Sequence, residues 1–124
     1  MRDVMSLAPR TVDVSTTLEQ AHELMRKQRC RHLPVTRDGV LVGIVSERDL
    51  YLVETLRGAD KTRDEVSDAM TIAVYTTNPT AKLRDVARVM AAERYGCALV
   101  MEGDRLVGIF TATDAFRHLV ERLV

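Results

Sequence analysis

The chain of 124 residues lacks tryptophan and contains few cysteines, prolines and glycines. Its formal net charge at pH 7 is zero, because 18 basic residues balance 18 acidic ones. This balance argues against a nucleic-acid partner, since such proteins usually carry a clustered basic excess. No apolar stretch approaches the roughly 20 residues that span a bilayer, and the N-terminus lacks an apolar signal core. We therefore predict a cytoplasmic protein with neither a nucleic acid nor a membrane as partner.

Residues that serve catalysis or metal binding are also scarce. Cys30 and Cys97 belong to no CxxC motif and no His/Cys cluster, so small buried thiols are expected rather than a disulfide or a metal site. The histidines at 22, 32 and 118 have no metal-ligand spacing, and no Ser-His-Asp arrangement is readable. His22 and His118 are expected at the surface or its boundary. The sequence predicts no metal site and no enzyme.

What the chain does contain is a duplication. The segment GIVSERD at residues 43–49 recurs as GIFTATD at residues 108–114, and Met5 matches Met70 at the same offset. The length fits one domain of the usual 100–200 residues, whereas each half, at about 60 residues, would be marginal alone. We predict two repeats, over residues 1–60 and 61–124, the first including the start of a polar linker at 57–65.

Apolar periodicity and turn residues predict the same order, β-α-β-β-α, in each repeat, and hence an α+β fold. In the first repeat the expected elements are a strand at 11–14, a helix at 18–28, hairpin strands at 32–36 and 40–45, and a helix at 47–56. In the second they are a strand at 72–76, a helix from about Pro79-Thr80, hairpin strands at 97–101 and 105–110, and a helix at 112–123. Thr17 and Gln20 suggest a capping box, and residues 66–70 a short helical lead-in.

Each repeat carries a hydroxyl residue and an aspartate where a strand passes into a helix: Ser46 with Asp49, and Thr111 with Asp114. One interpretation is a capping box that satisfies free backbone N–H groups. The other is a nucleotide site, because a helix N-terminus suits phosphate and a carboxylate accepts from ribose hydroxyls. In that case the glycine at 43 or 108 would let a ligand approach the strand backbone.

Longer segments point to a family. They are DVM (3–5), TTLEQAHELM (16–25), RHLPV (31–35), DGVLVGIVSERDL (38–50), DAM (68–70), ALV (98–100) and RLVGIFTATD (105–114). With them the chain resembles a tandem pair of cystathionine β-synthase (CBS) domains over essentially its whole length. The resemblance implies two repeats that pack pseudo-symmetrically through their sheets into one module. Such modules commonly form homodimers.

The resemblance also implies a regulatory adenosyl ligand, AMP, ADP, ATP or S-adenosylmethionine, in clefts between the two repeats, with no required cofactor. Carried over from the family pattern, Asp49 and Ser46 serve one cleft, and Asp114 and Thr111 serve the other. Each aspartate would take the ribose hydroxyls, and each Ser or Thr would contact ribose or phosphate.

The two clefts are expected to differ. Arg31, His32 and Arg48 bring cationic groups to the Asp49 cleft, whereas the residues matching 31 and 32 are Gly96 and Cys97. The Asp49 cleft would be completed by residues 71–74, including Thr71, and by Tyr95, which could pack on adenine. The Asp114 cleft would be completed near Cys30 and Arg31. Tighter binding is expected at Asp49.

Each of these side chains also has a structural interpretation: Arg31 as a surface cation, His32 as a structural histidine and Tyr95 as a rim or core aromatic. Two functions follow. The first is a non-catalytic sensor that signals through its dimer geometry or through a partner protein. The alternative is a structural oligomerisation module with no physiological nucleotide ligand, in which both aspartates only cap helices.

Overall fold

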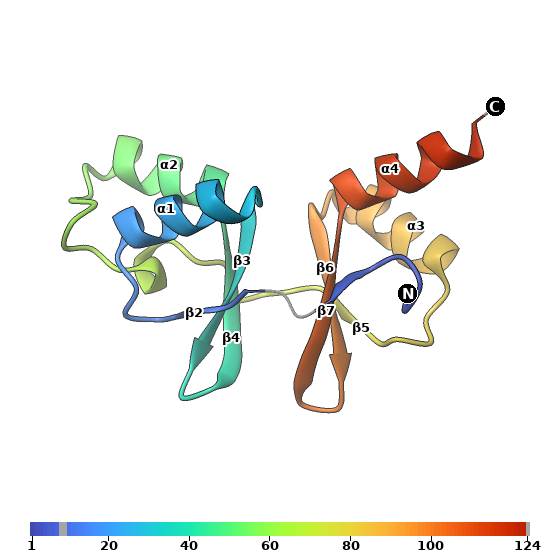
Figure 1. Ribbon diagram of the computed structural model, residues 1–124. Coiled ribbons are helices and arrows are strands. Elements are labelled where there is room, and N and C mark those ends of the chain that lie inside the picture. The colour runs from blue at the N-terminus through green and yellow to red at the C-terminus, as the bar shows by residue number, and fades with distance from the viewer. Residues whose placement is uncertain (8–9, 124) are drawn as a thin grey trace. The chain divides into compact units, whose positions relative to one another are not determined.

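A computed structural model describes residues 1–7 and 10–123, and these divide into two compact units (Figure 1). Residues 10–73 form the first unit. Residues 74–123 form the second unit together with residues 1–7 from the start of the chain. Each unit combines a small sheet with two α-helices, so the predicted α+β class is confirmed.

The first unit has a three-stranded sheet in the order β2-β3-β4, with β2 parallel and β4 antiparallel to β3. Its elements are β2 (Val12–Asp13), α1 (Leu18–Gln28), β3 (His32–Arg37), β4 (Val40–Ser46), α2 (Glu47–Leu56) and the 3-10 turn η1 (Val66–Asp68). Figure 1 shows α1 and α2 side by side, at the end of the hairpin opposite its turn. The predicted order β-α-β-β-α is confirmed in this repeat.

The core of the first unit lies between these helices and the strands. Its buried side chains are Val12, Leu18, Ala21, Met25, Leu33, Val35, Val45, Leu50, Val53 and Val66. Burial of a Leu, Val or Met side chain stabilises a fold by about 1.5–3 kcal/mol, so this cluster dominates the stability of the unit. The predicted capping box at Thr17 and Gln20 starts α1, and Arg29 ends it in a left-handed conformation (φ 53°).

The second unit repeats this plan with one extra strand, in the order β1-β7-β6-β5. Its elements are β1 (Ser6–Leu7), β5 (Thr76–Thr77), α3 (Leu83–Glu93), β6 (Cys97–Glu102), β7 (Arg105–Thr111) and α4 (Ala112–Arg122). The core cluster consists of Met1, Val86, Met90, Ala98, Val100 and Phe110. From β5 to α4 the predicted β-α-β-β-α order is confirmed again.

Two expected boundaries in the second repeat are wrong. The strand expected at 72–76 is reduced to β5, because Thr71 pairs instead with the backbone of Ile44 and the exposed Ile72 follows it. The helix expected from Pro79-Thr80 begins only at Leu83. Before it the chain makes a turn, in which the Asn78 side chain accepts hydrogen bonds from the Thr80 N–H (3.0 Å) and hydroxyl (2.7 Å). This turn satisfies the donors locally and delays the helix.

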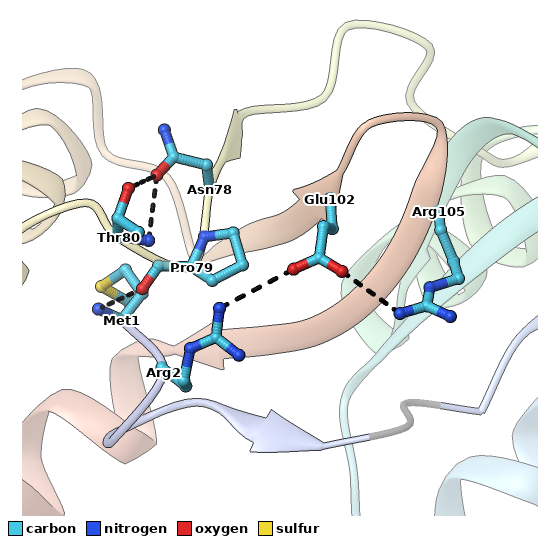
Figure 2. A network of polar contacts seen from close by, with 7 residues as sticks. All are labelled: Met1, Arg2, Asn78, Pro79, Thr80, Glu102 and Arg105. Atoms are coloured by element: carbon cyan, nitrogen blue, oxygen red, sulfur yellow. Dashed lines mark hydrogen bonds and ion pairs between the residues drawn. The ribbon is translucent and has the colours of Figure 1, made fainter.

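The first residues of the chain are built into the second unit (Figure 2). The Met1 nitrogen donates to the carbonyl of Ala81 at 2.7 Å, and the Arg2 N–H donates to that of Pro79 at 3.1 Å. The Arg2 side chain also pairs with Glu102 at 3.7 Å, a mostly exposed contact that contributes little. The second compact unit therefore includes the start of the chain. The predicted repeats, residues 1–60 and 61–124, have other bounds because they follow the duplication in the sequence.

The two strand glycines contact segments of the chain itself. A Cβ on Gly43 would lie 2.8 Å from the carbonyl oxygen of Thr71 and 2.9 Å from Met70 Sδ. A Cβ on Gly108 would lie 2.5 Å from Met5 Sδ. The methionine of each sequence repeat thus packs on the strand glycine of the other repeat: Met70 lies against Gly43, and Met5 lies against Gly108. The expectation that these glycines leave room for a ligand is wrong, because reciprocal N–H···O bonds between Ile44 and Thr71 (2.9 and 2.8 Å) bring that segment against the strand.

The two glycines should respond differently to an added methyl group. We expect Gly43→Ala to lower the free energy of unfolding by about 1–3 kcal/mol, the range for overpacking, and Gly108→Ala to lower it by less. At Gly43 the nearest obstacle is a hydrogen-bonded backbone carbonyl, whereas at Gly108 it is the flexible Met5 side chain. Urea denaturation of both variants measures the difference. A larger loss for Gly108→Ala would contradict this account.

Candidate functional site

Both hydroxyl–aspartate pairs form capping boxes. Ser46 Oγ accepts from the Asp49 N–H at 3.0 Å, and Asp49 Oδ2 accepts from the Ser46 N–H at 2.9 Å. Thr111 and Asp114 make the same two bonds at 3.1 and 2.9 Å. The capping interpretation is therefore correct for α2 and for α4. Each cap uses one carboxylate oxygen, so a ligand role for the other oxygen remains compatible with it.

His32 lies beside the Asp49 cap. In the antiparallel ladder His32 is the direct partner of Ser46, across the β3–β4 hairpin. Its Nδ1 is buried and has no hydrogen-bond partner, and the described residues contain no other buried side-chain nitrogen or oxygen in this state. An unsatisfied buried polar group costs about 1–3 kcal/mol, so native proteins retain few of them. Nδ1 is thus a polar atom in need of a partner, next to a predicted ligand residue.

The electrostatics of His32 follow from its surroundings. Burial lowers the pKa of the His32 imidazole below its usual value; the negative charge of Asp49 opposes this shift, and the positive charge of Arg31 adds to it. The ring is therefore mostly uncharged at pH 7. It can offer a hydrogen bond to a ligand without bringing a positive charge.

The predicted cations of this site stand where the start of α2 meets the start of β3. The carbonyl of Arg31 accepts a hydrogen bond from the Glu47 N–H at 2.9 Å, which joins the two segments. Arg31 and Arg48 are both exposed. The first unit therefore brings Arg31, His32, Ser46 and Asp49 together, and places Arg48 in the first turn of the same helix.

The second unit repeats the backbone but not the chemistry. Cys97 is the ladder partner of Thr111, and the carbonyl of Gly96 accepts from the Ala112 N–H at 3.0 Å. Burial raises the pKa of the Cys97 thiol to about 12, so it is uncharged at pH 7. One contact here was missed by sequence reasoning: Arg117 Nη1 lies 3.4 Å from Asp114 Oδ1. The i,i+3 spacing of these two residues on one helix could have indicated the contact.

The two remaining predicted site residues have contacts of their own. Thr71 pairs through its backbone with Ile44, within the first unit. Tyr95 belongs to the second unit, where its ring stacks on Tyr75 with centroids 5.3 Å apart and an interplanar angle of 25°. That Tyr95 helps to form the Asp49 site, and that ligands lie between the repeats, stay predictions.

A second polar pair, in the first unit, was not expected. His22 Nε2 lies 2.8 Å from Glu54 Oε1 and joins α1 to α2, with side-chain exposures of only 16% and 10%. The Tyr51 ring packs against His22 at 5.1 Å. The residues at the matching positions of the second repeat are Ala87 and Leu119, so the pair has no counterpart there. Sequence reasoning placed His22 at the boundary because it considered α1 alone.

Among residues 1–7 and 10–123, no three His, Cys, Asp or Glu side chains are grouped so as to hold a metal ion. In the same residues, no helix combines the length and the apolar character needed to cross a membrane.

Comparison with known proteins settles the family. The sequence model of the CBS domain matches residues 1–53 and 66–121. The chain belongs to the CBS domain family. It is 30% identical over 114 residues to the CBS domain-containing protein YhcV of Bacillus subtilis, and the match covers 92% of this chain and 81% of that protein. The resemblance predicted from the sequence is therefore confirmed.

Solved structures of CBS domain pairs share the fold and include ligand complexes. The CBS domain pair of protein MJ0100, solved with 5′-methylthioadenosine and S-adenosyl-L-methionine, superposes with a TM-score of 0.87 at 25% identity, covering 98% of this chain and 96% of that one. CBSX2, solved in complex with AMP, superposes with a TM-score of 0.80 at 28% identity, covering 97% and 95%. The fold is that of a CBS domain pair.

Proposed function

We propose that this CBS domain pair is a non-catalytic regulatory module that binds an adenosyl ligand at the start of α2. The observation that carries the proposal is His32 Nδ1, which is buried without a partner beside the Ser46–Asp49 box. The complexes of similar CBS pairs with AMP and with S-adenosylmethionine support the ligand class. The candidate ligands are AMP, ADP, ATP and S-adenosylmethionine.

The proposed roles use atoms that the fold leaves available. Asp49 Oδ1 accepts from the ribose hydroxyls, while Oδ2 stays in the helix cap. The positive end of α2 and the exposed Arg31 and Arg48 attract phosphate. His32 supplies an uncharged hydrogen-bonding nitrogen. These arginines favour a phosphate-bearing ligand, so AMP, ADP or ATP should bind more tightly than adenosine.

The output of such a module requires a second surface. Several apolar side chains of α2 and α4 are exposed: Tyr51, Leu52, Leu56, Phe116, Leu119 and Val120. Tyr51 and Phe116 occupy matching positions in the two repeats. We propose that these helices bury their apolar faces in a homodimer, as the resemblance implies, and that ligand binding changes its geometry or its affinity for a partner protein. A ligand acts in this way only through differential affinity for the two states.

Isothermal titration calorimetry of the purified chain with AMP, ADP, ATP, S-adenosylmethionine and adenosine tests the ligand proposal. A thermal-shift series provides a second readout, because a ligand at about 100 times its Kd stabilises the native state by roughly 2.7 kcal/mol. Binding of none of them would remove the regulatory function. It would favour the structural oligomerisation alternative, which the two capping boxes already support.

The dimer proposal predicts a change of mass in solution. Phe116→Glu should convert a dimer to a monomer in sedimentation velocity, because a charge would be buried in an apolar interface. Val40→Glu is the matched control, since Val40 is equally exposed (65% against 67%) but lies on a strand at the hairpin turn. A wild-type chain that sediments as a monomer at all concentrations would refute this part of the proposal.

A further inference from the structure

The two site aspartates differ in what their second carboxylate oxygen contacts. In both, Oδ2 accepts a backbone N–H at 2.9 Å as part of the helix cap. Asp114 Oδ1 is also contacted by Arg117 Nη1 at 3.4 Å. At the position that matches Arg117, α2 carries Leu52, and within residues 1–7 and 10–123 Asp49 Oδ1 takes part in no hydrogen bond or ion pair. The contact is therefore a difference between two otherwise equivalent caps.

We propose that Arg117 competes with the ribose hydroxyls for Asp114 Oδ1, so that the second site binds adenosyl ligands more weakly and the module fills its Asp49 site first. This inference rests on the proposed function, in which the aspartate takes the ribose. A carboxylate is an acceptor with two oxygens. Each carboxylate oxygen has room for about two donors, so with the cap on Oδ2 and the guanidinium on Oδ1 the two ribose hydroxyls must share Oδ1 with the guanidinium or displace it.

The strength of this competition is limited by solvent. The Asp114 side chain is 12% exposed but that of Arg117 is 69% exposed, so the guanidinium is easily displaced. The strength of exposed ion pairs corresponds to a change of up to about five-fold in affinity. Salt screens such pairs. Arg117 should therefore reduce the affinity of the second site by about two- to five-fold at low ionic strength, and by less in high salt.

Two reciprocal substitutions test the proposal, because each repeat supplies the residue for the other. Arg117→Leu should strengthen the second site by about two- to five-fold, and Leu52→Arg should weaken the first site by a similar factor. Leu52 is 43% exposed in the single chain and lies on the face proposed for the homodimer, so sedimentation velocity of Leu52→Arg is measured in parallel to separate a lost dimer from a weaker site. Arg105→Leu is the control, since this exposed arginine of the second unit pairs with Glu102 and not with Asp114. An Asp49→Asn background weakens the first site, so that the second site accounts for most of the measured binding.

AMP and S-adenosylmethionine are titrated by calorimetry at low salt and again in about 0.5 M NaCl, where screening is nearly complete beyond contact distance. A gain in second-site affinity for Arg117→Leu that shrinks in salt, with no gain for Arg105→Leu, is the expected result. If Arg117→Leu left the affinity of the second site unchanged, this inference would be overturned and the proposed function would stand. If Arg117→Leu weakened binding at the second site, the inference would also be overturned, because Arg117 would then be a ligand contact. If neither ligand bound any variant or the wild type, the proposed function would fail and this inference with it.

Discussion

His22→Ala is expected to lower the free energy of unfolding of the first unit by roughly 2–4 kcal/mol, because it leaves the Glu54 carboxylate buried without its partner. Removing one member of a fully buried ion pair costs about 3–5 kcal/mol, and this pair is slightly exposed, at 16% and 10%. Glu54→Leu is the reciprocal single variant, because it removes the other member of the same contact.

The double variant His22→Ala/Glu54→Leu gives this prediction its sharpest form. It installs the apolar residues that the second repeat carries at the matching positions, Ala87 and Leu119. Replacing both members of a buried pair by apolar groups is often neutral or stabilising. We therefore expect the double variant to lie within about 1 kcal/mol of the wild type, well above the His22→Ala single variant.

A double-mutant cycle measured by urea denaturation gives the coupling energy directly. His118→Ala is the control, because His118 takes part in no ion pair within the part of the chain that the structure describes. Losses that simply add in the double variant would show that the 2.8 Å contact contributes nothing beyond two independent side chains.

Asp49→Asn is expected to weaken AMP binding by ten-fold or more, while Asp114→Asn leaves the tighter site nearly unchanged. Hydrogen bonds to a charged group contribute about 1.5–3 kcal/mol, which is a factor of at least ten in affinity. Asparagine keeps one acceptor oxygen for the Ser46 N–H, so the helix cap survives. The substitution therefore removes the charge offered to ribose without removing the cap.

Calorimetry with AMP measures the affinity of both variants, and urea denaturation measures their stability in parallel. Asp49→Ala serves as the comparison, because it loses cap and charge together and should cost about 0.5–2 kcal/mol of stability. If Asp49→Asn bound AMP like the wild type while Asp49→Ala was only less stable, Asp49 would be a capping residue and nothing more.

Patterns confined to a few neighbouring residues were predicted well. The helix expected at 47–56 is α2 (Glu47–Leu56), and both hairpins lie where the glycine-containing turns placed them. Capping boxes were anticipated at Thr17, Ser46 and Thr111, and all three are formed. Such features depend on side chains within one turn of the backbone they satisfy, so local sequence carries their full signal.

Three features were not predicted: one pairing of distant segments, and two local contacts that were not considered beside the helix and cap signals. The start of α3 was placed too early, because the hydrogen bonds of Asn78 hold the preceding turn. Residues 72–75 read as a strand from their composition, yet the pairing partner of Ile44 is Thr71. Among the candidate site residues, the grouping of His32 with the Ser46 pair was expected from the family resemblance, and the hairpin register explains it. Arg117 was overlooked because the cap was considered without the next helical turn.

By itself the sequence determined the duplication, the β-α-β-β-α order, the caps and the family, because these are written in local spacing and in segments repeated at one offset. Only the tertiary structure decided that Met5 lies against Gly108 and Met70 against Gly43, and that His22 meets Glu54. It also decided that His32 Nδ1 is buried without a partner. The physical reason is that burial and partner choice depend on which segments pack together, and that packing is set by the whole core rather than by any one stretch of chain.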